Sequence, residues 1–237
     1  IQEGRGSGTT TQAVAAKTAL FGYVDLPTMM RAAVKGAPVI ATGVLLQKTP
    51  MSVMGFADRN IRKPEDIKGK IVATTPGGSN EQIWPLFLKK TGLKESDFRT
   101  VSGDAQTKLN AVFADYGINL VSSGIITHKD VLKDNPDLIR RFMTANTKAV
   151  VGAVKDPQGA VDAMLKANPK AGKRDTLLEG FEQTTQFYAD GGKSPHPFQI
   201  NDQTMTDTVS NMVEYGGLEA VAKKDPKAYY INDFLPK

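Results

Sequence analysis

The alternation of short apolar runs with helix-like stretches is the feature that most restricts what this chain can fold into. Strands that alternate with helices predict an α/β layer fold with a parallel or mixed sheet. We expect strands over residues 19–24, 38–46, 51–56, 70–74, 98–101 and 115–126. We expect helices over residues 9–17, 28–35, 81–91, 105–114, 137–154, 157–167, 173–188 and 202–215. The alternation of strands and helices extends to Ala114. From residue 129 onward nearly everything is expected to be helical, and the chain finishes on an extended aromatic tail over 229–237.

Length and composition exclude several classes of chemistry. A chain of 237 residues predicts one large domain or two small ones. The absence of cysteine excludes a disulfide scaffold, a thiolate zinc site, an iron–sulfur cluster and a cysteine nucleophile, and two histidines are too few for a histidine-rich metal site. We therefore expect no metal and no cofactor. The net charge of +5 excludes neither nucleic acid nor an acidic ligand, and no apolar run approaches the ~20 residues of a membrane-spanning helix.

Two glycine-rich turns each stand between a strand and the start of a helix. The first is Gly4–Gly8 and the second is residues 75–80. The amide groups and dipole of a helix N-terminus attract anions and polar ligands, and Ser7, Thr9, Thr10 and Ser79 add hydroxyl donors there. Plain helix capping by the same side chains is the alternative. Neither turn has the sequence of a P-loop or of a dinucleotide-binding loop, so nucleotide hydrolysis is not supported.

Asp25 follows an expected strand and precedes a helix that begins with Pro27. A carboxylate at the carboxyl end of a strand lies where open α/β sheets bind ligands, and it would accept a hydrogen bond from an amine or aminopyrimidine. A helix N-cap is an equally good interpretation of the same residue.

Three other patterns favour structural interpretations. Ser79, His128 and Asp25 could form a catalytic triad on paper, but no Gly-x-Ser-x-Gly elbow supports it, and we expect His128 to be exposed at the start of a polar helix. Trp84 is expected to pack rather than to stack on a ligand. The basic pairs at 89–90, 140–141 and 223–224 are expected on solvated helix faces.

The order and spacing of four motifs make the chain resemble a known family. These motifs are Arg5–Gly8, Asp25–Thr28 after a Phe-Gly-Tyr strand, residues 75–79, and the tail from Tyr229 to Lys237. Together they resemble the NMT1/THI5-like solute-binding proteins of ABC importers, which include taurine, nitrate and pyrimidine-precursor binders. The resemblance covers essentially the whole chain.

The resemblance implies a type II periplasmic binding protein fold, in which two α/β lobes clamp a ligand in a cleft between them. Residues 1–57 and 115–237 would form lobe one, and residues 58–114 an incomplete lobe two. The implied ligand-binding residues are Gly6, Ser7, Gly8, Thr9, Tyr23, Asp25 and Thr28 from lobe one, Gln47 near the hinge, Gly77, Gly78, Ser79 and Asn80 from lobe two, and Tyr116 near the return crossing.

The chain departs from the family pattern at two places. The family's opening strand and helix are absent before Ile1, and a strand–helix unit is absent between Ala114 and Asp115. Either this protein has lost that unit or the sequence omits disordered residues, and we favour the second because losing a central unit would uncover the core. The start at Ile1 indicates a processed or truncated chain, from which a signal peptide would already have been removed.

The resemblance implies an extracytoplasmic, monomeric protein that captures a small polar solute, aromatic or anionic in some relatives, and delivers it to a membrane permease without chemistry. An enzyme of the pyrimidine-synthesis branch on the same fold is one alternative, although that branch relies on cysteines that this chain lacks. A ligand-sensing domain of a transcriptional regulator is another alternative. We expect none of these three functions to involve nucleic acid binding by residues 1–237.

Overall fold

The computed structural model describes residues 2, 4–53, 60–74, 78–102 and 120–237. The predicted helix over 105–114 lies outside these residues.

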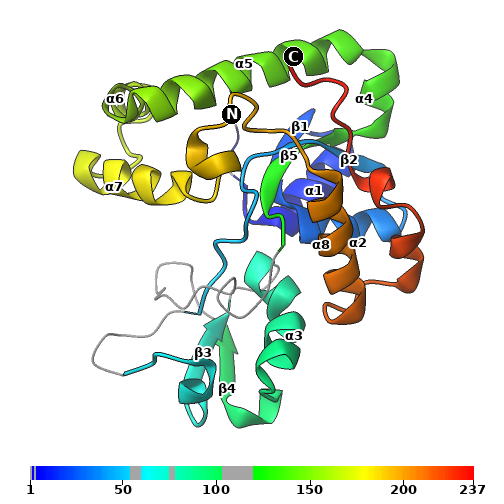
Figure 1. The fold of residues 1–237 in the computed structure, drawn as a ribbon, viewed down its shortest axis with the longest axis vertical. Helices are drawn as coiled ribbons and strands as arrows, with labels where there is room; N and C mark the ends of the chain where they lie inside the picture. Colours follow the sequence, from blue (N-terminus) through cyan, green and yellow to red (C-terminus); the bar gives the residue numbers. More distant parts are fainter. Residues whose placement is uncertain (1, 3, 54–59, 75–77, 103–119) are drawn as a thin grey trace.

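A three-stranded antiparallel sheet occupies the centre of the larger part of the molecule (Figure 1). Its strands are β1 (Phe21–Asp25), β2 (Val39–Val44) and β5 (Ser123–His128), with β5 between the other two. The register pairs Asp25 with Ser123, and the β2–β5 pairing shifts between Ala41 and Gly43. Gly124 is required by this close pairing, because a Cβ there would lie 2.4 Å from the carbonyl oxygen of Gly43.

The second part of the molecule contains a parallel pair of strands and one long helix, in the lower half of Figure 1. The strands are β3 (Ile71–Thr74) and β4 (Arg99–Ser102), and the helix between them is α3 (Ser79–Thr91). Gly92 ends α3 in the left-handed conformation, as its position after the helix predicts. The molecule therefore combines antiparallel and parallel pairing, and the predicted mixed α/β class is confirmed.

Three of the described α-helices begin where a cap and a proline predict a first turn. Pro27, Pro136 and Pro157 each stand in the first turn of a helix, after the capping residues Asp25, Asn135 and Asp156. The helices around the antiparallel sheet are α1 (Ser7–Ala15), α2 (Leu26–Val34), α4 (Lys129–Asp134), α5 (Pro136–Lys155), α6 (Pro157–Ala167), α7 (Arg174–Thr185) and α8 (Asp202–Glu214). Helix α5 lies across the top of Figure 1, and α6 and α7 lie at the left, beside its C-terminal end.

Two apolar clusters form the core. The larger joins Met29 and Met30 of α2 and Met212 of α8 to Leu86 and Phe87 of α3, so both parts of the molecule contribute to it. The smaller lies under α5 and consists of Ile125, Ile139, Met143, Phe198 and Phe234. Burial along α3 therefore attaches the second part of the molecule to the first.

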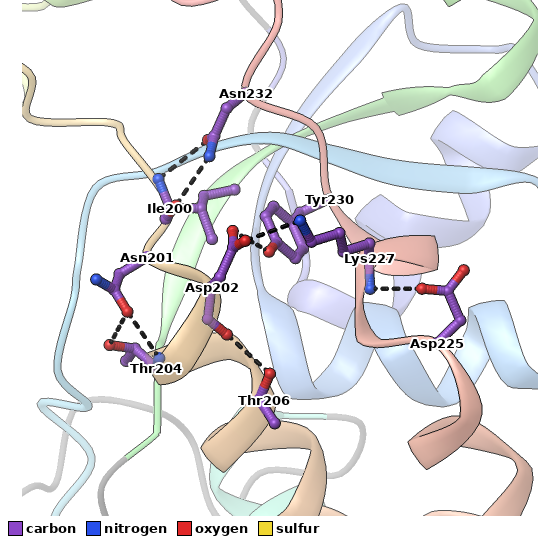
Figure 2. A network of polar contacts seen from close by, with 9 residues as sticks. All are labelled: Ile200, Asn201, Asp202, Thr204, Thr206, Asp225, Lys227, Tyr230 and Asn232. Atoms are coloured by element: carbon purple, nitrogen blue, oxygen red, sulfur yellow. Dashed lines mark hydrogen bonds and ion pairs between the residues drawn. The ribbon is translucent and has the colours of Figure 1, made fainter.

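The C-terminal segment is held against the sheet and α8, as Figure 2 shows. The amide of Ile231 donates to the carbonyl of Ala41 over 2.9 Å. The Tyr230 hydroxyl donates to the Asp202 carboxylate, which also pairs with the Lys227 ammonium at 2.8 Å. The predicted extended tail thus continues the sheet beyond β2 through a single bridge between Ala41 and Tyr230.

Several predicted elements have other bounds in the structure. Helix α1 begins at Ser7, two residues before the predicted start, because Gly6 takes a φ of 120° that places the turn earlier. Of the strand predicted over 51–56, the described residues contribute only one bridge position, at Ser52. Strand β5 begins at Ser123, and the described residues before it, 120–122, are not strand.

Within the described ranges, no helix has both the length and the hydrophobicity needed to cross a membrane.

Candidate functional site

The N-termini of α1 and α3 meet at a pair of serine hydroxyls. Ser7 Oγ lies 3.1 Å from Ser79 Oγ, although 72 positions separate the two residues. The N-cap residues are Gly6 and Gly78, and neither helix has a side-chain hydrogen bond at its cap. The first-turn amides of both helices therefore lack the usual capping acceptor and are oriented to bind an anion or a polar ligand.

The hydroxyls around this junction are already partly engaged. Ser7 Oγ accepts a hydrogen bond from the amide of Asp25 at 3.0 Å, which fixes the start of α1 to the end of β1. Thr9 Oγ1 donates to the Gly6 carbonyl and Thr11 Oγ1 to the Ser7 carbonyl. Ser7 and Ser79 are both half-buried, so the junction is partly shielded from water.

Asp25 is a buried helix cap. Its carboxylate Oδ2 accepts from the amide and the hydroxyl of Thr28, and Oδ1 accepts from the Ser122 hydroxyl at 3.3 Å. The residue is only 2% exposed, and this burial raises the pKa of its carboxyl to about 6, while the bonds from Thr28 and Ser122 act in the opposite direction. The structure thus shows the capping role of Asp25, and its role as a ligand acceptor stays a prediction.

Two tyrosines stand near the end of β1. Tyr23 is 51% exposed, yet desolvation of its hydroxyl raises the pKa of that group to about 12. Tyr188 adds to this increase, and a hydrogen bond with Ser123 opposes it. Burial also raises the pKa of Tyr188. Both phenols therefore remain neutral hydrogen-bonding groups at physiological pH.

Gln47 is hydrogen-bonded to three backbone carbonyls. Its backbone amide donates to the Phe187 carbonyl at 2.8 Å, and its side-chain Nε2 donates to the carbonyls of Val44 and Gln199. An open hollow of about 410 Å³ is lined by Gln47, Ala189, Ser194, His196, Gln199 and Asn201. None of the other predicted site residues that the structure describes lines this hollow.

The remaining predicted residues fall into two groups. Gly8 and Asn80 lie in the first turns of α1 and α3, beside the serine junction. Gly77 and Tyr116 lie outside the described residues, so their part in a site stays a prediction.

Sequence reasoning missed Ser122, Ser123 and Tyr188. The two serines reach the end of β1 because β5 pairs antiparallel with it, and the pairing partner lies almost 100 residues away in the chain. No local pattern in the sequence signals that pairing, nor the approach of Tyr188 to Tyr23.

Ser79, His128 and Asp25 do not form a catalytic triad. His128 stands at the end of β5 opposite to Ser123, and five residues of strand separate them by roughly 16 Å, while Asp25 pairs with Ser123. The expected exposure of His128 is wrong: it is 5% exposed, because it ends β5, the central strand of the sheet, opposite Val39. Its Nδ1 accepts a hydrogen bond from the amide of Asp130 as the cap of α4. In the described part of the chain, no group of three or more acidic or histidine side chains could hold a metal ion.

Comparisons with known proteins agree with this architecture. The model of the NMT1/THI5-like family matches residues 1–113 and 104–160. The riboflavin-binding protein RibY of Chloroflexus aurantiacus is 20% identical over 91% of this chain and 70% of its own length. That alignment spans 248 residues, more than this chain contains, so RibY carries internal residues without a counterpart here.

Two solved structures have the same fold. The alkanesulfonate-binding protein SsuA of Xanthomonas axonopodis pv. citri, bound to MOPS, has a TM-score of 0.64 and 13% identity, covering 92% of this chain and 82% of its own. The periplasmic aliphatic sulphonate binding protein SsuA of Escherichia coli has a TM-score of 0.65 and 14% identity, covering 88% of this chain and 75% of its own. Because the family match covers more than half of the sequence, this chain belongs to the NMT1/THI5-like family of solute-binding proteins and has the periplasmic binding protein fold.

Proposed function

We propose that this protein captures a small solute with an anionic group where the N-termini of α1 and α3 meet, and delivers it to an ABC importer. The observation that carries the proposal is the 3.1 Å contact between Ser7 Oγ and Ser79 Oγ, which brings two helix N-termini without side-chain caps to one place. A single uncapped helix is common, whereas two that converge from separate parts of the molecule form a site for one ligand held from both sides.

The chemistry of the junction favours an anion with several oxygen atoms. The first-turn amides of each helix carry the partial positive charge of the helix dipole, and a sulfonate offers three oxygens to receive their hydrogen bonds. The nearby Asp25 carboxylate is already bonded to Thr28 and Ser122, which reduces its competition for these donors.

Two relatives of this fold support an anionic ligand. The SsuA proteins bind an alkanesulfonate or an aliphatic sulphonate, whereas RibY binds riboflavin, which has no anionic group. We propose that Tyr23, which can both pack and hydrogen-bond, contacts the remainder of such a solute.

We further propose the arrangement that this function requires. Residues 1–57 with 115–237 form one lobe and residues 58–114 the other, and the solute enters between them. The protein works as an extracytoplasmic monomer beside a membrane permease, needs no cofactor and performs no reaction. The predicted residues Gly6, Gly8, Thr9 and Tyr23 contact the solute from the first lobe, and Gly78 and Asn80 from the second.

Isothermal titration calorimetry with MOPS, methanesulfonate and riboflavin tests this proposal. We expect at least one sulfonate to bind and to be recovered chemically unchanged, which mass spectrometry of the recovered compound establishes. Ser79→Ala should weaken sulfonate binding by about 10- to 100-fold, since a hydrogen bond to a charged group contributes about 1.5–3 kcal/mol. Ser96→Ala, an exposed serine remote from the junction, is the control.

Two results would reject the proposal. Absence of binding for every anion up to millimolar concentration would remove the anion site, and conversion of a bound compound to a product would replace a carrier with an enzyme.

A further inference from the structure

Positively charged side chains from two helices gather at the C-terminal end of α8. The Nζ atom of Lys89, on α3, donates to the carbonyl of Glu214 at 3.2 Å. The Nζ atom of Lys90 lies 4.4 Å from the centroid of the Tyr215 ring, and that of Lys89 lies 5.5 Å from it. The guanidinium of Arg31, on α2, donates to the carbonyl of Gly216. Lys89 and Lys90 are exposed, as the sequence predicts for this basic pair, and they also contact the C-terminal end of α8.

These contacts are attractive for two independent reasons. The carbonyls at the C-terminus of a helix lack intrahelical partners and carry the negative end of the helix dipole. An ammonium group there donates hydrogen bonds to these carbonyls and is attracted by the dipole. An ammonium above a tyrosine ring is attracted by the negative face of the ring. Tyr215 is itself oriented by a hydrogen bond with the Glu214 side chain, which also raises the pKa of its hydroxyl.

The contacts lie at the opposite end of α3 from the proposed ligand site. Ser79 begins α3 at the serine junction, and Lys89 and Lys90 stand three turns later. Ten to eleven residues of helix separate the two ends by roughly 15–17 Å. Between them, Ile83, Leu86 and Phe87 are buried in the cluster shared with α2 and α8.

We propose that Lys89 and Lys90 are positioning residues. They form a latch on α8 that holds α3 where its first turn contacts the ligand. This inference rests on the proposed function, because it assumes that Ser79 and the first turn of α3 contact the solute. Apolar burial along α3 is non-directional, whereas the two lysines attach to one carbonyl and one ring. A latch that favours the closed arrangement raises ligand affinity without touching the ligand, since affinity scales with the population of the binding-competent state.

The first test needs no ligand and uses the absence of native cysteines. Spin labels on Ser96→Cys and Gln158→Cys, both exposed and in separate parts of the molecule, report the distance between those parts by pulsed electron resonance. The Lys89→Met/Lys90→Met variant should broaden this distance distribution and move it to longer values. Lys89→Arg/Lys90→Arg should restore it, because arginine keeps the charge and the contact with the ring.

Lys166→Met is the matched control, since it removes an exposed lysine from a different helix, α6. A double methionine variant with the distance distribution of the parent would overturn the latch, as would an equal change in Lys166→Met. Tyr215→Leu should reproduce the broadening, and an unchanged distribution in that variant would reject the ring as the partner of Lys90. Circular dichroism and the melting temperature of each variant show whether it is folded.

The second test measures binding kinetics with MOPS, or with whichever sulfonate binds the parent protein. The double methionine variant should release the sulfonate about 3- to 10-fold faster with little change in association rate, because the latch acts after first contact. An unchanged dissociation rate would overturn the latch while leaving the ligand site intact. A parent protein that binds no sulfonate would instead reject the proposed function, and the distance measurement would still decide the latch.

Discussion

At the scale of single residues, Asp25 shows how one side chain can have both structural and functional interpretations. The sequence predicted its position at the end of a strand and its capping potential, and the structure shows the cap formed with Thr28. The sequence could not predict its burial or its bond from Ser122, because both depend on a strand that returns from almost 100 residues away. The raised pKa of its carboxyl follows from that burial and not from any local motif.

The pKa of Asp25 predicts how stability changes with pH. The carboxyl has a pKa of about 6 in the folded protein against 3.8 when exposed, so the folded state holds a proton that the unfolded state releases. Its contribution to stability is complete below pH 3.8 and is lost as the pH rises through about 6, by roughly 2–3 kcal/mol. Urea unfolding at pH 4.5 and 7.5 should show this loss in the parent protein and not in Asp25→Asn.

Asparagine is the matched replacement because its side-chain oxygen can still cap α2 while it cannot titrate. The difference between the two proteins isolates Asp25 from the other carboxyl groups. An equal pH dependence in both would show that Asp25 is ionised in the folded state with an ordinary pKa.

At the scale of elements, helices were easier to predict than strand pairing. Caps and prolines stand next to the helix that they start, so Asp25–Pro27, Asn135–Pro136 and Asp156–Pro157 each placed an N-terminus to within a few residues. Strand β5 was predicted as an extended stretch, but its insertion between β1 and β2 was not, because pairing depends on distant segments and not on local propensity.

A glycine substitution in β5 tests this pairing. Gly124→Ala should destabilise the protein by about 1–3 kcal/mol, because its Cβ would lie 2.4 Å from the Gly43 carbonyl oxygen and 3.0 Å from Leu26. Gly152→Ala on α5 is the contrasting variant: nothing lies within 4 Å of its added Cβ, and alanine should stabilise the helix by about 0.5–1 kcal/mol. Chemical denaturation measures both, and a Gly124→Ala variant as stable as the parent would mean that the two strands are farther apart.

A cap substitution in α3 tests the anion site at the element scale. Gly78→Asp would place a carboxylate where the first-turn amides of α3 now lack a side-chain cap, which should keep or raise the melting temperature. The same carboxylate would occupy those amides and repel an anion, so sulfonate affinity should fall at least 10-fold. Unchanged affinity in Gly78→Asp, measured by calorimetry, would show that α3 contributes no anion-binding amides.

At the scale of the whole molecule, the family resemblance and the structure support one account of a solute-binding protein. The order of elements and four short motifs were enough to predict the family and the fold, which the family match and the solved structures confirm. The sequence could not predict that Ser7 and Ser79 are in contact, or that α3 shares one apolar cluster with α2 and α8. Both features arise from the packing of segments that are distant in the chain.

The most direct test of the account is the position of bound sulfonate, which an ¹⁵N-resolved NMR titration with MOPS can locate. The account predicts that the largest shifts occur at the amides of Ser7, Gly8, Ser79 and Asn80, with both helix N-termini saturating at the same MOPS concentration. Shifts confined to one helix, or centred on the hollow between Gln47 and Asn201, would contradict the proposal that α1 and α3 hold one solute between them.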